Sequence, residues 1–149
     1  MSRILGRARR GTTHRSRGQG LVEFALVLPI MLFLFMILFD FGRAVYAYST
    51  VADSARQGVR YAIVNQTTAT IKSTAAGAAT GLGIAPGSVQ VAFHPAGTTV
   101  GVCTPIDLGC VAEVQVPYRW TAITPIISNV IGQVDMSSTA RMPIERIYP

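Results

Sequence analysis

Hydrophobic residues are concentrated in one long segment near the start of the chain. From Leu21 to Phe39 every position is apolar except Glu23. A membrane-spanning helix needs about 20 consecutive apolar residues, whereas the apolar part of a secretory signal peptide has only about 7–15. Pro29 lies inside the segment, where we expect a kink rather than a break, because membrane helices tolerate proline better than soluble helices do. The pattern therefore predicts a membrane-spanning helix over residues 21–39.

The helical pattern continues beyond the apolar segment. Asp40 and Arg43 mark the far edge of the membrane. Apolar residues then recur at spacings of mostly three and four, as on one face of a helix, at Val45, Tyr48, Ala52, Ala55, Val59, Ala62 and Ile63. No proline or turn cluster interrupts residues 30–64. We therefore expect one continuous helix over residues 19–64, about 70 Å long, of which only part lies in the bilayer.

Residues 65–149 have the pattern of a small head with both helix and strand. An alanine-rich stretch over Ile71–Leu82 predicts a short helix. Strand patterns cover Ser88–Phe93, Val111–Trp120 and Gln133–Ile144. Pro117 cannot donate a ladder hydrogen bond, so we expect the second strand to be at an edge, bulged or broken there. The segment between the second and third strands is expected to be a loop with one apolar turn of helix.

These elements predict an α+β protein. A long N-terminal transmembrane helix continues into a small extracytoplasmic head, which has a short helix and an antiparallel sheet of about three strands. The expected organisation is a leader over residues 1–18, the long helix over residues 19–64 and the head over residues 65–149.

Charge separates the leader from the rest of the chain. The chain has thirteen basic and seven acidic residues, a formal net charge of +6. Six arginines and no acid lie in residues 1–18, and the remaining seven bases and seven acids cancel. A nucleic-acid-binding protein would spread its basic residues over a folded face, so nucleic acid is not an expected partner. A basic flank beside an apolar segment instead indicates a cytoplasmic N-terminus and a single-pass protein of the cytoplasmic (inner) membrane.

Two cysteines, Cys103 and Cys110, bracket six residues that are rich in turn formers. We favour a disulfide that pins a loop between strands, because the head is expected on the oxidising side of the membrane. Free thiols and a metal site are the alternatives. The spacing is not C-x-x-C and no histidine cluster accompanies it, so a zinc ion would lack ligands.

The sequence assembles no set of catalytic residues. His14 lies in the leader, and His94 follows a strand, where we expect it at the surface or in a turn. No Ser/His/Asp set, pair of catalytic carboxylates or phosphate-binding glycine loop is evident. We therefore expect no enzymatic activity, no cofactor and no bound metal.

Glu23 needs an explanation, since a carboxylate is unfavourable among apolar side chains. The helix dipole favours an acid near the start of a helix, but this does not account for the residues around it. Gly18 ends the basic stretch, four residues beginning with Gln19 follow, and then come Glu23-Phe24 and the uninterrupted apolar residues up to Phe39. This G-x-x-x-x-E-F arrangement resembles the type IV prepilin processing signal. The resemblance implies cleavage between Gly18 and Gln19 by a prepilin peptidase on the cytoplasmic side.

A longer stretch of sequence narrows the family. The sequence RGQGLVEFALVLP, followed by FDFGRAVY and ADSARQGVRYA, resembles the TadE-like proteins, which are pseudopilins of the tight-adherence (Flp) pilus machinery. The resemblance is strong over residues 17–63 and looser over the tail, where STARMPIE is similar to the last strand of the family. The family fold is a long N-terminal helix carrying a small sheeted head. The major Flp pilin is little more than the helix, so the head implies a minor component.

The resemblance also implies partners and a role for the helix. The partners are the prepilin peptidase, other pilins or pseudopilins packed through the N-terminal helix, which contains Pro29, and the pilus assembly platform, with membrane lipid around them. Cleavage would create a new α-amine on Gln19. A buried carboxylate needs a partner, and the family implies that Glu23 pairs with the α-amine of a neighbouring subunit. Desolvation offsets much of the attraction, so this pair would set the axial register more than the stability.

Two other interpretations are retained. In the first, the chain is a signal-anchored extracytoplasmic binding protein that is not part of a pilus. In the second, it is a secreted protein whose signal is cut after Ala47. The length of the apolar segment and the charges at Asp40 and Arg43 disfavour the secreted form.

Overall fold

The computed structural model describes residues 16–148 of the chain. Most of the expected basic leader, residues 1–15, lies outside the described residues. The chain divides into an N-terminal unit, Met1–Leu38, and a C-terminal unit, Phe39–Pro149. The boundary between the units falls at the end of the apolar segment.

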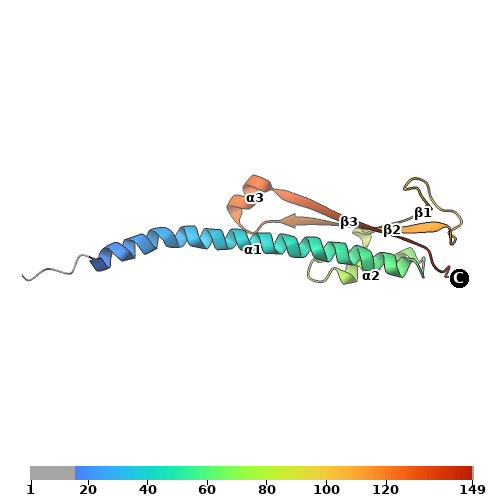
Figure 1. Cartoon of the computed structure of the whole chain (residues 1–149), viewed down its shortest axis with the longest axis horizontal. Helices are drawn as coiled ribbons and strands as arrows, with labels where there is room; N and C mark the ends of the chain where they lie inside the picture. The colour runs from blue at the N-terminus through green and yellow to red at the C-terminus, as the bar shows by residue number, and fades with distance from the viewer. Residues whose placement is uncertain (1–15, 149) are drawn as a thin grey trace, which may run out of the picture. The chain divides into compact units, whose positions relative to one another are not determined.

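The predicted α+β fold class is confirmed, with one long helix followed by a short helix and a three-stranded antiparallel sheet (Figure 1). In chain order the elements are α1 (Ser16–Ala62), α2 (Thr68–Ala78), the 3-10 turn η1 (Pro86–Ser88), β1 (Gln90–Pro95), β2 (Cys110–Thr121), α3 (Pro125–Ile131) and β3 (Gln133–Pro143). Each predicted strand is present within two residues of its expected bounds. The structure extends β1 through His94, which sequence analysis placed after the strand.

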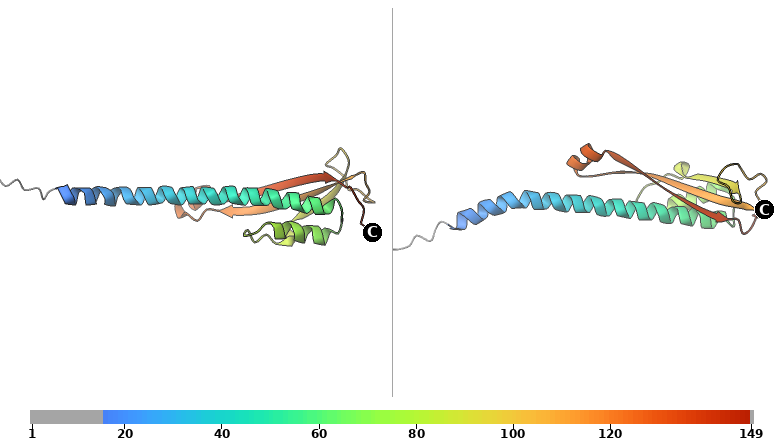
Figure 2. Two further views of the ribbon diagram at one scale, coloured as in Figure 1. Left: turned by 60° about the horizontal axis from the view of Figure 1, so that its bottom comes forward. Right: turned by 45° about the horizontal axis from the view of Figure 1, so that its top comes forward.

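Helix α1 is continuous over 47 residues and passes through Pro29 without a break. Figure 2 (right) shows α1 curving within its blue segment, which contains Pro29. The helix ends at Ala62, close to the expected end. The chain then turns at Asn65, whose side chain accepts a hydrogen bond from the backbone N–H of Thr67 at 2.9 Å. This turn leads into α2.

In the sheet, β2 is the central strand and pairs antiparallel with β1 and β3. Pairing with β1 extends from Cys110 to Gln115, and the rest of β2 pairs among the described residues with β3 alone. Pro117 lies in this second part, opposite Ser137. The missing N–H of the proline therefore costs no ladder hydrogen bond with β1, and the predicted edge position is confirmed locally.

The core of the C-terminal unit lies between α1, α2 and one face of the sheet (Figure 2). On β2 the buried residues alternate along the strand: Cys110, Ala112, Val114, Val116 and Trp120. After Asp40 the buried residues of α1 are all small or medium-sized: Ala47, Val51, Ser54, Ala55, Gly58, Val59 and Ala62. Small side chains allow the helix backbone to approach the sheet closely.

The three elements approach one another closely at Gly58. A Cβ atom built on Gly58 would stand 2.8 Å from Cβ of Ala75 in α2 and 3.0 Å from Cγ1 of Val114 in β2. Both distances are shorter than the usual carbon–carbon contact of about 3.5–4.0 Å. Glycine at this position therefore allows α1, α2 and the sheet to meet.

One part of the predicted helix face is wrong. Val45 and Tyr48 were expected on the packed face, but their side chains are 52% and 63% exposed. The helix instead packs through Ala47 and Val51, which are both 1% exposed. Since α1 carries apolar residues on two faces in this region, spacing alone could not distinguish the face that meets the sheet.

Candidate functional site

The proposed processing residues lie in the first turns of α1. Because α1 begins at Ser16, the peptide bond between Gly18 and Gln19 lies inside the helix, whereas the sequence placed the start of the helix at residue 19. Gly18 and Gly20 are exposed, and a Cβ at either position would meet no described atom within 4 Å. Glycine lowers helix stability by about 1 kcal/mol relative to alanine. This first turn is therefore a weak part of the helix.

Glu23 lies two turns into α1 and is exposed. Among the residues whose side chains the structure describes, none forms a hydrogen bond or an ion pair with Glu23. Its neighbour Phe24 is also exposed, with 61% of its surface accessible. Glu23 therefore presents its carboxylate on an exposed, largely apolar stretch of the helix surface.

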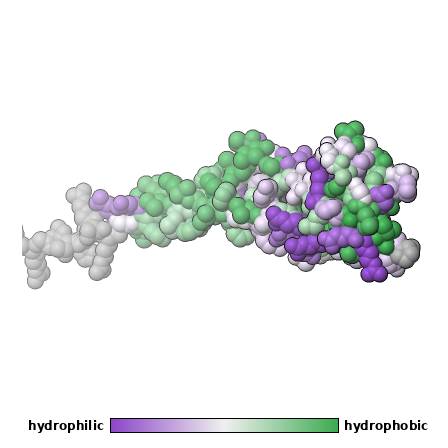
Figure 3. All heavy atoms as spheres, turned by 45° about the vertical axis from the view of Figure 1, so that its right-hand side comes forward, coloured by the Kyte–Doolittle hydropathy of each residue, from purple (hydrophilic) through white to green (hydrophobic). Residues whose placement is uncertain are grey.

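The N-terminal unit presents apolar side chains on every side of α1. The exposed large residues include Leu21, Val22, Leu26, Val27, Ile30, Leu34, Phe35 and Leu38. Figure 3 shows hydrophobic residues over this part of the helix and many hydrophilic residues on the C-terminal unit. A helix that is apolar all round is buried in lipid or in a large protein. α1 is long and apolar enough to span a membrane, as expected for a single-pass protein.

Apolar side chains remain exposed on α1 after the apolar segment ends. Phe41, Val45 and Tyr48 follow the i, i+4, i+7 spacing of one helix face, and each has more than half of its surface accessible. We call these three residues the outer stripe. The outer stripe is not covered by the sheet, which packs on a different face of α1 through Ala47 and Val51.

Asp40 has a structural role that the sequence did not indicate. Its side chain is buried, with only 2% of the residue exposed, although it directly follows the apolar segment. Oδ1 accepts a hydrogen bond from the backbone N–H of Ile123 at 3.0 Å, and Oδ2 accepts one from the N–H of Thr124 at 2.9 Å. Arg43, one turn further along α1, approaches Oδ1 at 3.5 Å. We call this arrangement the Asp40 clamp.

The Asp40 clamp favours the ionised carboxylate. The side chain of Thr124 and the two backbone N–H groups lower the pKa of Asp40 below its ordinary value, with Arg43 as a smaller influence in the same direction. Asp40 lies beyond the expected membrane-spanning residues 21–39. The clamp therefore ties the turn after β2 to α1 where the helix leaves the apolar segment.

Cys103 and Cys110 form the predicted disulfide. The bond joins the loop after β1 to the first residue of β2, and the backbone N–H of Cys103 also donates to the carbonyl of Phe93 at 2.9 Å. Asp107 lies close enough to both sulfur atoms for the three groups to surround an ion. Both sulfur atoms are used in the disulfide, so the oxidised loop does not offer the two thiolates that such a site needs.

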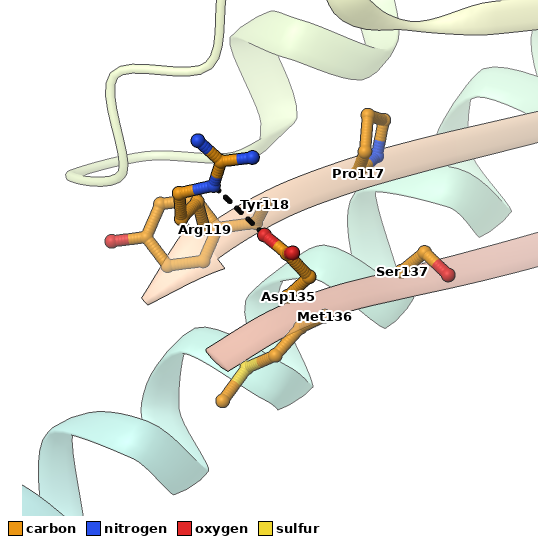
Figure 4. Close-up of a pocket in the computed structure, with 6 residues that line it drawn as sticks. All are labelled: Pro117, Tyr118, Arg119, Asp135, Met136 and Ser137. Atoms are coloured by element: carbon orange, nitrogen blue, oxygen red, sulfur yellow. Dashed lines mark hydrogen bonds and ion pairs between the residues drawn. The ribbon is translucent and has the colours of Figure 1, made fainter. Parts of the chain in front are cut away.

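A shallow pocket on the sheet is lined by Pro117, Tyr118, Arg119, Asp135, Met136 and Ser137 (Figure 4). Nε of Arg119 donates to Oδ1 of Asp135 at 2.8 Å, and this hydrogen bond raises the pKa of Arg119. The two opposite charges in the pocket therefore satisfy each other across the paired strands β2 and β3.

The architecture defines a class of protein: an α+β head built along the second half of a helix whose first half can span a membrane. The family model described as TadE-like protein matches residues 18–60. The resemblance drawn from the sequence is therefore confirmed over residues 18–60. The match covers most of α1 and ends before α2 and the sheet. No curated protein and no solved structure matches the chain.

The TadE-like family is a family of structural components associated with the tight-adherence (Flp) pilus, and the match suggests such an association for this chain. The matched segment contains the proposed processing residues, the Asp40 clamp residue and Gly58. The sequence alone identified the proposed processing residues, because they form a local motif. Sequence reasoning missed the structural roles of Asp40 and Gly58, although both residues lie in the stretch that carries the family resemblance.

Proposed function

We propose that the protein is a minor pseudopilin, a structural component of a tight-adherence pilus or of its assembly machine. It packs against other pilins through α1 and presents its C-terminal unit outside the cytoplasmic membrane. The observation that carries the proposal is the exposed apolar surface of α1. It covers all sides of the helix in the N-terminal unit and continues as the outer stripe of Phe41, Val45 and Tyr48. A single-pass anchor needs apolar surface only within the bilayer. The outer stripe extends that surface past Asp40, as expected for contact with neighbouring helices.

We propose that a prepilin peptidase cleaves the chain between Gly18 and Gln19. Removal of the leader arginines leaves an α-amine near the cytoplasmic face of the membrane. Glu23 then pairs with the α-amine of a neighbouring subunit. Its exposure and its lack of a partner among the described side chains support this pairing. The pair sets the axial register between helices, because apolar surfaces alone would allow them to slide.

The N-terminal sequence of the mature chain tests processing. Cleavage predicts Gln19 as the first residue. Met1 or Ser2 would indicate an uncleaved signal anchor instead, and Tyr48 would indicate a secreted product. Ala47 is almost fully buried and packs with Trp120 and Ala122, so a cut after it would remove part of the folded C-terminal unit.

Gly18→Ala and Gly20→Ala form a matched pair for this test. Both positions have open space, and both substitutions strengthen the first turn of α1. If the peptidase recognises the residue before the cut, Gly18→Ala blocks cleavage and Gly20→Ala does not. Equal cleavage of both variants would contradict a cut at Gly18, and equal loss would show that helix stability alone controls the reaction.

Glu23→Gln tests the pairing. The variant should insert into the membrane and be cleaved normally, yet fail to enter assembled pili or pilus-assembly complexes. Glu145→Gln is the matched control, since it removes one negative charge from an exposed side chain of the C-terminal unit. If Glu23→Gln co-purifies with other pilins as well as the wild type does, the pairing is wrong.

A further inference from the structure

The connection between β2 and β3 carries an exposed apolar surface outside α1. Four of its large side chains are more than half exposed: Ile123, Ile126, Val130 and Ile131. The sequence from Trp120 to Val134 contains no ionisable side chain. We call residues 121–132, which include α3, the apolar tip. Isolated exposed apolar residues are common on proteins, but a contiguous uncharged group of this size needs a partner.

The direction of the β2–β3 hairpin places the apolar tip at one end of the C-terminal unit. Val114, in the first half of β2, packs beside Gly58 in the last turns of α1. Trp120, near the end of β2, packs in one cluster with Ala47 of α1. Later residues of β2 thus meet earlier residues of α1. Strand β2 therefore runs antiparallel to α1. The hairpin turns back near the part of α1 that directly follows the apolar segment.

The Asp40 clamp fixes how far the hairpin reaches. Asp40 directly follows Phe39, the last residue of the apolar segment. Its carboxylate holds the backbone N–H groups of Ile123 and Thr124 at 3.0 and 2.9 Å. Helix α3 begins at the next residue, Pro125. The first exposed isoleucines of the tip are therefore held beside the residue at which α1 leaves the bilayer.

We propose that the apolar tip binds the membrane surface, with its isoleucine and valine side chains in the leaflet from which α1 emerges. The proposal rests on α1 spanning the membrane and does not require pilus assembly. Apolar faces of segments at the membrane surface bury about 5–10 Å into the boundary between headgroups and acyl chains, and the binding strengthens with the apolar area buried. A bilayer surrounds α1 at this level in every inserted copy of the chain. Lipid is therefore favoured over a second copy as the occupant.

The charges beside the tip fit the same position. The nearest ionisable residues along the hairpin are Arg119 and Asp135, one at each base of the tip, and they pair with each other at 2.8 Å. On both β2 and β3, the first charged residue next to the uncharged tip therefore lies at the same position along the hairpin. This position marks the depth at which the tip would leave the lipid and enter water.

Val130 and Val100 allow a matched test of this contact. Both are valines, with 80% and 79% exposure respectively. Val100 lies in the loop between β1 and β2, and β2 separates this loop from the tip by 12 residues, about 35–40 Å. Each is replaced by cysteine in the full chain, with the native disulfide retained. The new thiol is labelled with a nitroxide, and the chain is placed in nanodiscs of phosphatidylethanolamine and phosphatidylglycerol at one chain per disc.

Collision with dissolved oxygen and with a water-soluble nickel complex then reports the depth of each label. We expect the label at Val130 to have a severalfold lower accessibility to nickel and a higher accessibility to oxygen than the label at Val100. Equal nickel accessibility at the two positions would overturn the proposal. Protection of the Val130 label only in discs that hold two chains would also overturn it, because a second copy would then be the occupant.

The test is independent of the proposed pilus function. Single chains in nanodiscs contain neither a peptidase nor other pilins, so failed processing or assembly leaves the accessibility of Val130 unchanged. Conversely, a water-exposed tip would not contradict the predicted cleavage after Gly18 or the predicted pairing of Glu23.

Discussion

Gly58→Ala adds one methyl group at the point where α1, α2 and the sheet meet. In an isolated helix this change is favourable by about 1 kcal/mol, because glycine has a low helix propensity. In this fold the new Cβ would stand 2.8 Å from Cβ of Ala75 and 3.0 Å from Cγ1 of Val114. The β-carbon of Ala75 cannot rotate away, since it is bonded directly to the backbone of α2. Relief therefore requires a shift of about 1 Å between elements.

The size of the effect follows from these two opposing contributions. Overpacking of a well-packed core costs about 1–3 kcal/mol, and the rigid neighbour Ala75 favours the upper part of this range. Subtracting the helix propensity gain leaves a loss of about 1–2 kcal/mol in the free energy of unfolding. For a unit of this size such a loss lowers Tm by about 5–10 °C.

Thermal unfolding in nanodiscs can measure this change through the fluorescence of Trp120, the one tryptophan of the chain, which is 6% exposed. Gly77→Ala is the matched control, because it makes the same substitution in α2 where a Cβ would meet no described atom within 4 Å. The control should raise Tm slightly. If Gly58→Ala also raises Tm, the close approach of α1, α2 and the sheet is wrong.

Three further outcomes are expected for the C-terminal unit. Asp40→Asn should lower Tm more than Asp53→Asn, whose exposed carboxylate pairs with Arg56 one turn away; equal effects would contradict the Asp40 clamp. Because folding lowers the pKa of Asp40 below 3.8, the clamp is fully effective above that pH and is lost as the pH falls through the folded pKa. The Tm difference between the wild type and Asp40→Asn should therefore vanish in acid and persist at neutral pH. Replacing Cys103 and Cys110 by alanine should lower the free energy of unfolding by about 2–3 kcal/mol, seen as a lower urea midpoint, since the bond closes a short loop.

The helix and the strands could be predicted because their signals are local. The uninterrupted pattern of α1 and the alternation in β2 each depend on residues that are neighbours in the sequence. The processing motif around Gly18 and Glu23 is local in the same sense. The structure places Gly18 and Glu23 at exposed positions in the first turns of α1.

The contacts between elements could not be predicted. Asp40 and Thr124 are separated by 84 positions, and the groups that bind the carboxylate are backbone N–H groups, which every residue except proline has. No pattern of side chains marks such a contact. The packed face of α1 was misassigned at Val45 and Tyr48 for a related reason. Its true face is made of small residues such as Ala47, whose burial depends on the sheet that approaches them.

The two ends of the sheet are tied to α1 at different heights. The Asp40 clamp holds one end. At the other end the carbonyl of Ile63, the residue directly after α1, accepts the backbone N–H groups of Glu145 and Arg146, both at 3.1 Å. The intervening helix is about 35 Å long, and its residues would span about twice that length if they were pulled straight. Tension along α1 must therefore break one of these attachments before this stretch can lengthen, so the sheet acts as a brace against mechanical extension of the helix.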